Sequence, residues 1–167
     1  KRKLWIKRLF GVSRFYGRQS RKLLDIGCGD GQFLCLAKEN GWEVTGTELS
    51  SWSSKYIISM NGIEVYNDDI LNITFKQDNF DVITMWHVIE HVKNPASIID
   101  KIYSLLKQDG LFVIACPNVR NYLFQFIYLI IRRKRLKLFS INDRELHLFH
   151  FTETTLIELL KQSGFKI

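Results

Sequence analysis

Short apolar runs alternate with amphipathic segments along almost the whole chain. Five runs predict strands because they are brief and rich in large apolar side chains: Lys22–Cys28, Val44–Leu49, Glu64–Asn67, Phe80–Val88 and Leu111–Cys116. Apolar residues at helical spacing predict helices over Gln32–Asn40, Ser50–Asn61, Asn94–Leu106 and Thr152–Ser163. Strands that alternate with helices indicate an α/β, doubly wound, mostly parallel sheet with helices on both faces.

Capping residues indicate where several of the predicted helices begin. Ser50, Asn94 and Thr152 precede predicted helices and can accept a hydrogen bond from the first turn. Asp109-Gly110 predicts a turn before the fifth strand, and Phe165–Ile167 predicts the start of a sixth strand. In such sheets, ligands bind at the carboxyl ends of the strands, so functional residues are expected just after them.

Length and cysteine content narrow the class of protein. The chain has 167 residues, which is enough for one domain. Its three cysteines, Cys28, Cys35 and Cys116, form no CxxC pair, which argues against a disulfide scaffold or a zinc ribbon. We therefore expect a reducing compartment and a cytoplasmic location.

The net charge of +7 is unevenly distributed. Residues 1–22 hold nine lysines and arginines and no acid, and residues 132–137 hold five more. The rest of the chain has a net charge of −7, which argues against a broad basic groove and a nucleic-acid partner. The two basic segments leave open peripheral contact with an anionic membrane.

Both basic segments also carry apolar side chains. Residues 1–19 predict a basic N-terminal helix, which either packs on the domain or lies on a lipid surface. Residues 120–145 predict a lid-like apolar and basic insertion, whose ten-residue apolar part is too short to span a bilayer. An ordinary buried helix is the alternative for that apolar part.

A glycine-rich turn follows the first predicted strand. It reads Asp25-Ile26-Gly27-Cys28-Gly29-Asp30-Gly31, and Glu48 stands at the end of the second strand. Glycines allow a ligand to approach the main chain closely, and an acid at the second position can bind the hydroxyls of a ribose. Gln32 stands where a dinucleotide-binding turn would have its third glycine.

This turn resembles the DxGxGxG loop of the class I S-adenosylmethionine-dependent methyltransferases, in particular their quinone-biosynthesis type. Further segments resemble the same family in the same order: Asp69-Ile70, Asn79–Ile83, His87–Val92, Leu111–Asn118, His147–Thr152 and Ser163–Phe165. The resemblance covers residues 20–167 and implies a Rossmann-like methyltransferase domain with S-adenosylmethionine as cofactor. It implies methyl transfer to a small-molecule or lipid-like acceptor, at a hydroxyl oxygen.

The resemblance also implies the cofactor-binding residues, which are Asp25, Gly27, Gly29, Gly31, Glu48, Leu49, Asp69, Ile70 and Trp86. Glu48 would bind the ribose, and Asp69 the adenine amino group, with Asp68 as the alternative. The glycine turn and Trp86 would line the methionine portion, with Asp25 favouring its ammonium group.

All four histidines lie in segments expected at the mouth of this site. His147 and His87, followed by His150, are the candidate general bases, because a histidine can accept a hydroxyl proton near neutral pH. His91 is expected to orient its turn. His87, Glu90 and His91 have a spacing that would place them on one helical face, but we predict no metal.

Members of this family usually finish the sheet with an antiparallel hairpin, and this chain ends before it. We therefore expect either that the protein continues beyond Ile167 or that a partner completes the sheet. A catalytically silent cofactor-binding subunit or membrane-associated adaptor is the main alternative function. A nicotinamide-dependent oxidoreductase is the second alternative, and Gln32 disfavours it.

Overall fold

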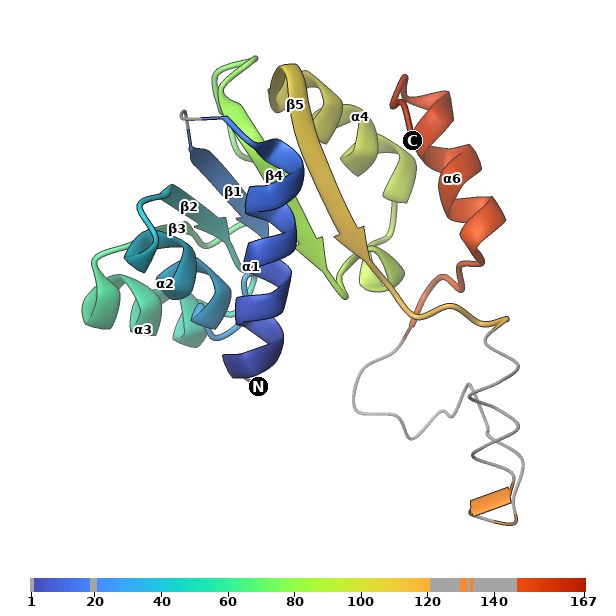
Figure 1. The fold of residues 1–167 in the computed structure, drawn as a ribbon, viewed down its shortest axis with the longest axis horizontal. Coiled ribbons are helices and arrows are strands. Elements are labelled where there is room, and N and C mark those ends of the chain that lie inside the picture. Colours follow the sequence, from blue (N-terminus) through green and yellow to red (C-terminus); the bar gives the residue numbers. More distant parts are fainter. Residues whose placement is uncertain (1, 19–20, 121–129, 132, 134–146) are drawn as a thin grey trace.

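A computed structural model describes residues 2–18, 21–120, 130–131, 133 and 147–167. Five strands form its sheet: β1 (Lys22–Ile26), β2 (Glu43–Thr47), β3 (Glu64–Tyr66), β4 (Phe80–Trp86) and β5 (Leu106–Ala115). They lie in the order β3-β2-β1-β4-β5, and all neighbouring pairs are parallel (Figure 1). The predicted doubly wound α/β fold is confirmed. The expected insertion over residues 120–145 lies almost entirely outside the described residues.

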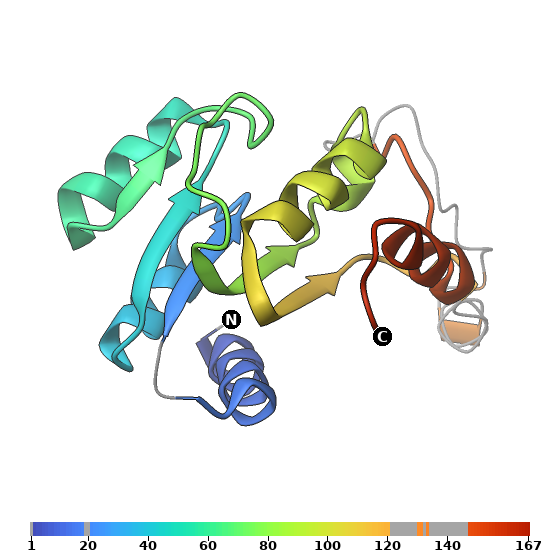
Figure 2. The ribbon, with the colours of Figure 1, turned by 90° about the horizontal axis from the view of Figure 1, so that it is seen from above.

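Helices cover both faces of this sheet: α1 (Arg2–Tyr16), α2 (Gln32–Glu39) and α3 (Ser51–Asn61) on one, and α4 (Pro95–Leu105) and α6 (Glu153–Gln162) on the other. Adjacent strand residues point to opposite faces, so Leu23 packs with the first group and Leu24 with the second. Figure 2 shows α1 and α4 on opposite sides of the strands. The strands are thus buried on both faces, as their continuous apolar runs predict.

The helix boundaries agree with the capping residues in the sequence. Ser50 accepts a hydrogen bond from the Ser53 amide at 3.3 Å, and Asn94 caps α4, which has Pro95 in its first turn. Thr152 and Thr155 form a capping box at the start of α6. Local side-chain hydrogen bonds therefore set these starts, which is why the sequence could locate them.

Two predictions at the edge of the sheet are wrong. The fifth strand begins at Leu106, before the predicted turn, because Leu106 pairs with Phe80. Pairing resumes only at Leu111 opposite Val82, and the residues between carry the expected turn as an irregularity, with Asp109 at a φ of 59°. Phe165–Ile167 form no strand; Phe165 instead packs its ring against Phe112, 5.5 Å between centroids.

The N-terminal helix α1 packs on the domain. Leu9 and Val12 are buried, and Trp5 lies against Phe33 of α2, with 5.7 Å between ring centroids. None of the helices in the described ranges has the length and apolar character that crossing a bilayer requires. The packed face of α1 fixes the helix beside the carboxyl end of β4, where Trp86 lies.

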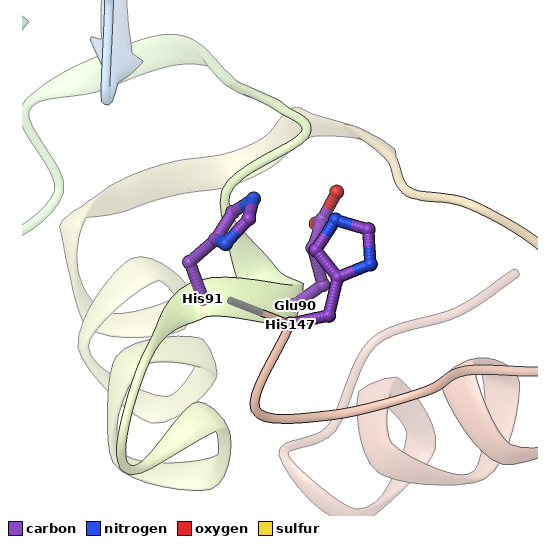
Figure 3. A group of neighbouring side chains, drawn as sticks. All are labelled: Glu90, His91 and His147. Carbon is purple, nitrogen blue, oxygen red and sulfur yellow. The ribbon is translucent and has the colours of Figure 1, made fainter. Parts of the chain in front are cut away.

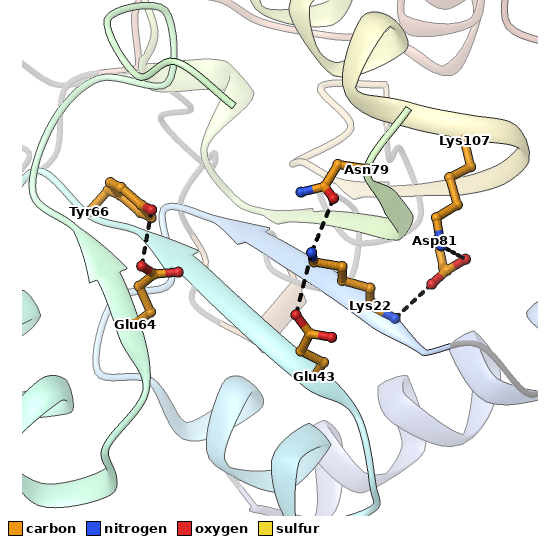
Figure 4. A network of polar contacts seen from close by, with 7 residues as sticks. All are labelled: Lys22, Glu43, Glu64, Tyr66, Asn79, Asp81 and Lys107. Carbon is orange, nitrogen blue, oxygen red and sulfur yellow. Dashed lines mark hydrogen bonds and ion pairs between the residues drawn. The ribbon is translucent and has the colours of Figure 1, made fainter. Parts of the chain in front are cut away.

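A buried aspartate, Asp81, links α1 to the amino-terminal end of the sheet, and Figure 4 shows its contacts with Lys22 and Lys107. Asp81 accepts hydrogen bonds from the Tyr16 hydroxyl at 2.7 Å, the Lys22 amide at 2.8 Å and the Lys107 ammonium group at 2.8 Å. The Lys22 ammonium group also donates to Asn79 at 3.0 Å. Because these bonds satisfy a buried carboxylate, they stabilise the end of the sheet that faces away from the candidate site.

Candidate active site

A cavity of about 350 Å³ opens at the carboxyl ends of the strands. Its lining comes from the ends of β1 to β3 and from the segment after β4: Ile26, Gly27, Thr47, Glu48, Leu49, Asp68, Asp69, Ile70, His87, Val88, His91, Val92 and Ile98. This is the edge at which doubly wound sheets bind ligands, and the volume is typical of a small-molecule site. Five of the nine predicted cofactor-binding residues line it: Gly27, Glu48, Leu49, Asp69 and Ile70.

The glycines of the turn after β1 have different surroundings. Gly27 has a φ of 68°, and a Cβ at this position would lie 2.5 Å from Cγ2 of Val88. Gly29 has a φ of 58° with nothing within 4 Å of its Cβ position, whereas a Cβ on Gly31 would lie 2.7 Å from Ile57. Gly27 therefore allows Val88 to pack against the turn, while Gly29 leaves open main chain.

The Glu48 carboxylate is held in place by two backbone amides. Its Oε2 accepts from Gly29 and its Oε1 accepts from Ser50, both at 2.8 Å. Each carboxylate oxygen can accept a further hydrogen bond, so the group stays able to bind two hydroxyls. These bonds also couple the end of β2 to the glycine turn.

Asp25 lies outside the lining of the cavity and is only 2% exposed. It accepts a hydrogen bond from the Thr84 hydroxyl at 2.6 Å. Burial raises the pKa of Asp25 to about 7, although the Thr84 hydrogen bond and the nearby Arg8 act in the opposite direction. Asp25 thus supports the turn from within the sheet.

Both candidate adenine acids line the cavity. The Asp68 carboxylate accepts hydrogen bonds from the side chain of Asn72 at 2.9 Å and from the Asp69 amide at 2.7 Å. These two hydrogen bonds lower the pKa of Asp68. Asp69 uses Oδ1 for the Leu71 amide at 3.0 Å. Ile70 beside them is buried and offers an apolar surface to a ring.

Trp86 does not line the cavity. Its ring packs against Trp5 and Phe33, at centroid distances of 6.1 and 5.4 Å. The Arg8 guanidinium lies over the same ring at 4.5 Å, and one of its nitrogens is 3.3 Å from Nε2 of His87. Arg8 is thereby brought beside the cavity from α1.

The sequence interpretation missed Arg8. Trp5, Arg8, Leu9 and Val12 recur at the spacing of one helical face, and three of these four side chains are apolar and pack on the domain. A cation on the packed face of an amphipathic helix needs a partner, so the position of Arg8 on that face could have indicated a functional residue.

The four histidines gather around the segment that follows β4. His87 and His91 line the main cavity, whereas His147 and His150 line a second cavity of about 80 Å³ together with Glu90. The rings of His91 and His147 are 4.8 Å apart, and those of His147 and His150 are 6.1 Å apart. Figure 3 shows Glu90, His91 and His147 together at this turn.

The spacing of His87, Glu90 and His91 predicts that they share one helical face. This prediction is wrong for His87. The helical turn contains only Ile89–His91, and His87 has a φ of 57°. The group of possible metal-binding side chains in the described part of the chain is instead Glu90, His91 and His147, whose donor atoms lie within 4.8 Å of one another. His147 comes from a distant segment, so local spacing could not include it.

Comparisons with known proteins agree with this architecture. A family model for a methyltransferase domain matches residues 3–167. Ubiquinone biosynthesis O-methyltransferases from Psychrobacter arcticus and Glaesserella parasuis are 30% identical over 122 residues and 33% identical over 117 residues. These regions cover 66% and 61% of this chain but 47% and 48% of the relatives, so the chain spans about half the length of the curated relatives it matches.

A solved structure shows the same likeness over almost the whole chain. It is a SAM-dependent methyltransferase from Archaeoglobus fulgidus, with a TM-score of 0.73 and 26% sequence identity. The match covers 99% of this chain and 70% of that one. The family resemblance predicted from the glycine turn is therefore confirmed.

Proposed function

Since this chain belongs to the class I S-adenosylmethionine-dependent methyltransferases, we propose that it transfers a methyl group from S-adenosylmethionine to a small-molecule or lipid-like acceptor, at a hydroxyl oxygen. The observation that carries the proposal is the cavity at the carboxyl edge of the sheet. It brings together Gly27, Glu48 and Asp69, which follow three different strands.

The cofactor lies along this edge, with its ribose at Glu48. The carboxylate is already oriented by the Gly29 and Ser50 amides, so it binds the ribose hydroxyls with little rearrangement. Asp69 accepts from the adenine amino group, while Leu49 and Ile70 cover the two faces of the ring. Gly29 presents open main chain to the methionine portion, and Gly27 lines the cavity beside it.

Arg8 binds the carboxylate of the methionine portion. Its guanidinium lies over Trp86 and within 3.3 Å of His87, which itself lines the cavity. A planar guanidinium is well suited to a carboxylate, and stacking on an indole fixes its position. In this arrangement Trp86 acts on the cofactor through Arg8.

Methyl transfer forms a bond between the acceptor oxygen and the methyl carbon and breaks the bond between that carbon and sulfur. S-adenosylhomocysteine leaves, and the acceptor loses its hydroxyl proton. The sulfonium is already activated, so alignment of the two reactants is the main contribution of the protein, worth about 7–11 kcal/mol in favourable cases. A base for the proton is the remaining requirement.

His150 is the base that the structure supports best among the candidates His147, His87 and His150. It lines the smaller cavity together with Glu90 and His147. Slight desolvation of the exposed His150, and then the neighbouring His147, lower the pKa of His150, which favours a neutral imidazole that can accept a proton near pH 7. His87 is less suited because Nε2 faces the Arg8 guanidinium.

We expect the protein to transfer labelled methyl groups from S-adenosylmethionine to a hydroxylated aromatic or lipid-like acceptor in a screen. With that acceptor, His150→Gln should lower kcat about 100-fold and leave the affinity for S-adenosylhomocysteine unchanged. Full turnover by the variant would contradict the role of His150. Binding of S-adenosylhomocysteine without transfer to any acceptor would instead favour the catalytically silent subunit.

The acceptor is expected to be apolar or membrane-borne, and α1 provides a surface for anionic lipid. Its outer side exposes Leu4, Ile6, Phe10 and Phe15 among Lys3, Lys7 and Arg14, with no acid in the helix. Apolar side chains interspersed with bases are typical of helices that lie at a membrane interface. The name of the curated relatives, ubiquinone biosynthesis O-methyltransferase, is consistent with an apolar acceptor.

We expect the protein to float with vesicles of phosphatidylcholine and phosphatidylglycerol, and not with phosphatidylcholine alone. Reversing Lys3, Lys7 and Arg14 to glutamate should weaken this binding about 100-fold or more. The matched control reverses Lys93, Lys161 and Lys166, which are exposed away from α1, and should retain binding. Equal loss in both triple variants would show a dependence on net charge alone and would contradict the assigned surface.

A further inference from the structure

A second groove, the helical groove, lies between three helices and outside the candidate active site. Its volume is about 280 Å³, and its lining comes from α1, the turn before α2, α2 and α3: Arg2, Trp5, Asp30, Gln32, Cys35, Leu36, Glu39, Tyr56 and Asn61. Among the described residues, none lines both this groove and the cavity at the carboxyl ends of the strands. The volume lies just below the roughly 300–1,000 Å³ of pockets for drug-sized ligands, so a fitting ligand is about one ring in size.

Helix α2 lines the helical groove along its whole length. Its lining residues recur at intervals of three and four, which places them on one face of the helix: Gln32, Cys35, Leu36 and Glu39. Of the two central positions, Leu36 is buried and Cys35 is half-buried, whereas the polar Gln32 and Glu39 stand at the two ends. The groove therefore has an apolar middle between polar ends.

Two aromatic rings also line the helical groove, one from α1 and one from α3. Trp5 is half-buried and is held by Phe33 and Trp86, at centroid distances of 5.7 and 6.1 Å. Tyr56 is 45% exposed and stacks on Trp52, with 5.6 Å between the centroids and 7° between the ring planes. Rings that packing holds in place but leaves accessible offer flat apolar surfaces to a ligand at little cost in entropy.

Hydrogen-bonding groups of both kinds accompany these rings. The Asp30 carboxylate accepts from the backbone amide of Gln32 at 3.3 Å and from its side-chain amide at 2.7 Å. Arg2 and Glu39 form an exposed ion pair at 3.4 Å, and Asn61 adds a second side-chain amide. Each of these groups has more donors or acceptors than these contacts use, so the lining can donate and accept hydrogen bonds to a ligand.

The charges of the lining disfavour a charged ligand. Arg2 and Glu39 offset each other, and Asp30 leaves one formal negative charge. An organic cation on the Trp5 ring would meet the Arg8 guanidinium, which lies 4.7 Å from the ring centroid, as well as Arg2. An anion would meet the two carboxylates. A neutral ligand with several hydroxyls fits better, because each hydroxyl donates one hydrogen bond and accepts up to two.

We propose that the helical groove binds the pyranose ring of a glycoside. A pyranose has an apolar face of C–H groups, which packs on an aromatic ring, and an edge of neighbouring hydroxyls. Trp5 and Tyr56 provide the rings. Gln32, Glu39 and Asn61 provide planar amide and carboxylate groups, whose paired polar atoms match two neighbouring hydroxyls. The proposal does not rest on methyl transfer, because a glycoside can be titrated without cofactor or acceptor.

Saturation-transfer NMR of the wild-type chain with the methyl glycosides of glucose, galactose, mannose and N-acetylglucosamine tests this site. We expect at least one of the four to receive saturation at its ring C–H protons, and titration of the same signal gives its Kd. Tyr56→Ala removes one of the two rings, and Glu39→Ala removes a charged acceptor. Each variant should weaken binding of that glycoside about 10-fold or more.

Phe15→Ala and Glu158→Ala are the matched controls. Phe15 is an exposed ring on α1 and Glu158 an exposed acid on α6, and both lie outside the helical groove. Both variants should bind the glycoside as the wild type does. Glu48→Ala should also retain this binding, because Glu48 belongs to the other cavity. Loss of glycoside binding in Glu48→Ala would place the sugar in that cavity and would overturn the proposal.

Circular dichroism of each variant monitors folding, and the exposed Glu39 provides a test if Tyr56→Ala does not fold. No saturation transfer to any of the four glycosides would overturn the proposal. So would wild-type affinity in folded Tyr56→Ala or Glu39→Ala, or equal weakening in the two control variants. Glycoside binding by a chain that transfers no methyl group would instead count against the proposed function alone.

Discussion

Glu48→Ala is expected to weaken binding of S-adenosylhomocysteine about 100-fold or more. The carboxylate is placed by the Gly29 and Ser50 amides to accept two ribose hydroxyls, and hydrogen bonds to a charged group contribute about 1.5–3 kcal/mol each. Loss of both corresponds to at least about 3 kcal/mol, or roughly 100-fold in Kd. Calorimetric titration of the purified variant measures this directly.

Glu43→Ala is the matched control, since Glu43 begins the same strand that Glu48 follows. Its carboxylate pairs with Lys22 at 3.4 Å, far from the cavity lining. Glu43→Ala should bind S-adenosylhomocysteine as the wild type does. Both Glu43→Ala and Glu48→Ala should retain the wild-type circular dichroism spectrum. Unchanged affinity in folded Glu48→Ala would remove Glu48 from the cofactor site.

Gly27→Ala should destabilise the fold and abolish cofactor binding together. A left-handed backbone costs a residue with a Cβ about 1–2 kcal/mol, and the added carbon would lie 2.5 Å from Val88. Overpacking of that kind adds about 1–3 kcal/mol, so the free energy of unfolding should fall by about 2–5 kcal/mol. Urea unfolding measures the stability, and titration with S-adenosylhomocysteine measures binding.

Gly41→Ala separates backbone strain from the packing clash. Gly41 has a φ of 82° but nothing within 4 Å of its Cβ position, and it lies outside the cavity. This variant should lose only about 1–2 kcal/mol and bind normally. Truncating Val88 to alanine in the Gly27→Ala chain should recover part of the lost stability. If the two glycine variants were equally stable, close packing of Val88 on the turn would be refuted.

Much of the fold could be predicted from the sequence because its signals are local. Continuous apolar runs mark strands buried on both faces, and Ser50 and Thr152 begin helices through bonds within one turn. The early start of β5 was missed because Leu106 is held by its pairing with Phe80, a contact between strands. Phe165 was wrongly assigned to a strand because an apolar residue after Gly164 also suits packing against Phe112.

The residues of the site also fall into those that the sequence could locate and those that it could not. Gly27 and Glu48 lie just after strands, so the topology of a parallel sheet brings them together, and both line the cavity. His147 reaches the site through backbone bonds to Glu90, which no spacing along the chain encodes. Helical spacing places Arg8 on the packed face of α1, but its position beside Trp86 and His87 depends on how α1 packs on the domain. His87 does not lie on the expected helical face because its backbone is left-handed, a conformation that is uncommon for residues other than glycine.

Calorimetric titration of the wild-type chain with S-adenosylhomocysteine, and in parallel with NAD, tests the central claim most directly. Binding of one molecule of S-adenosylhomocysteine per chain and no measurable heat with NAD are expected, because Glu48 and the glycine turn are placed for a single ribose beside the main chain. Binding of NAD, or no binding of S-adenosylhomocysteine by folded protein, would contradict the assignment of this cavity to the methyl donor.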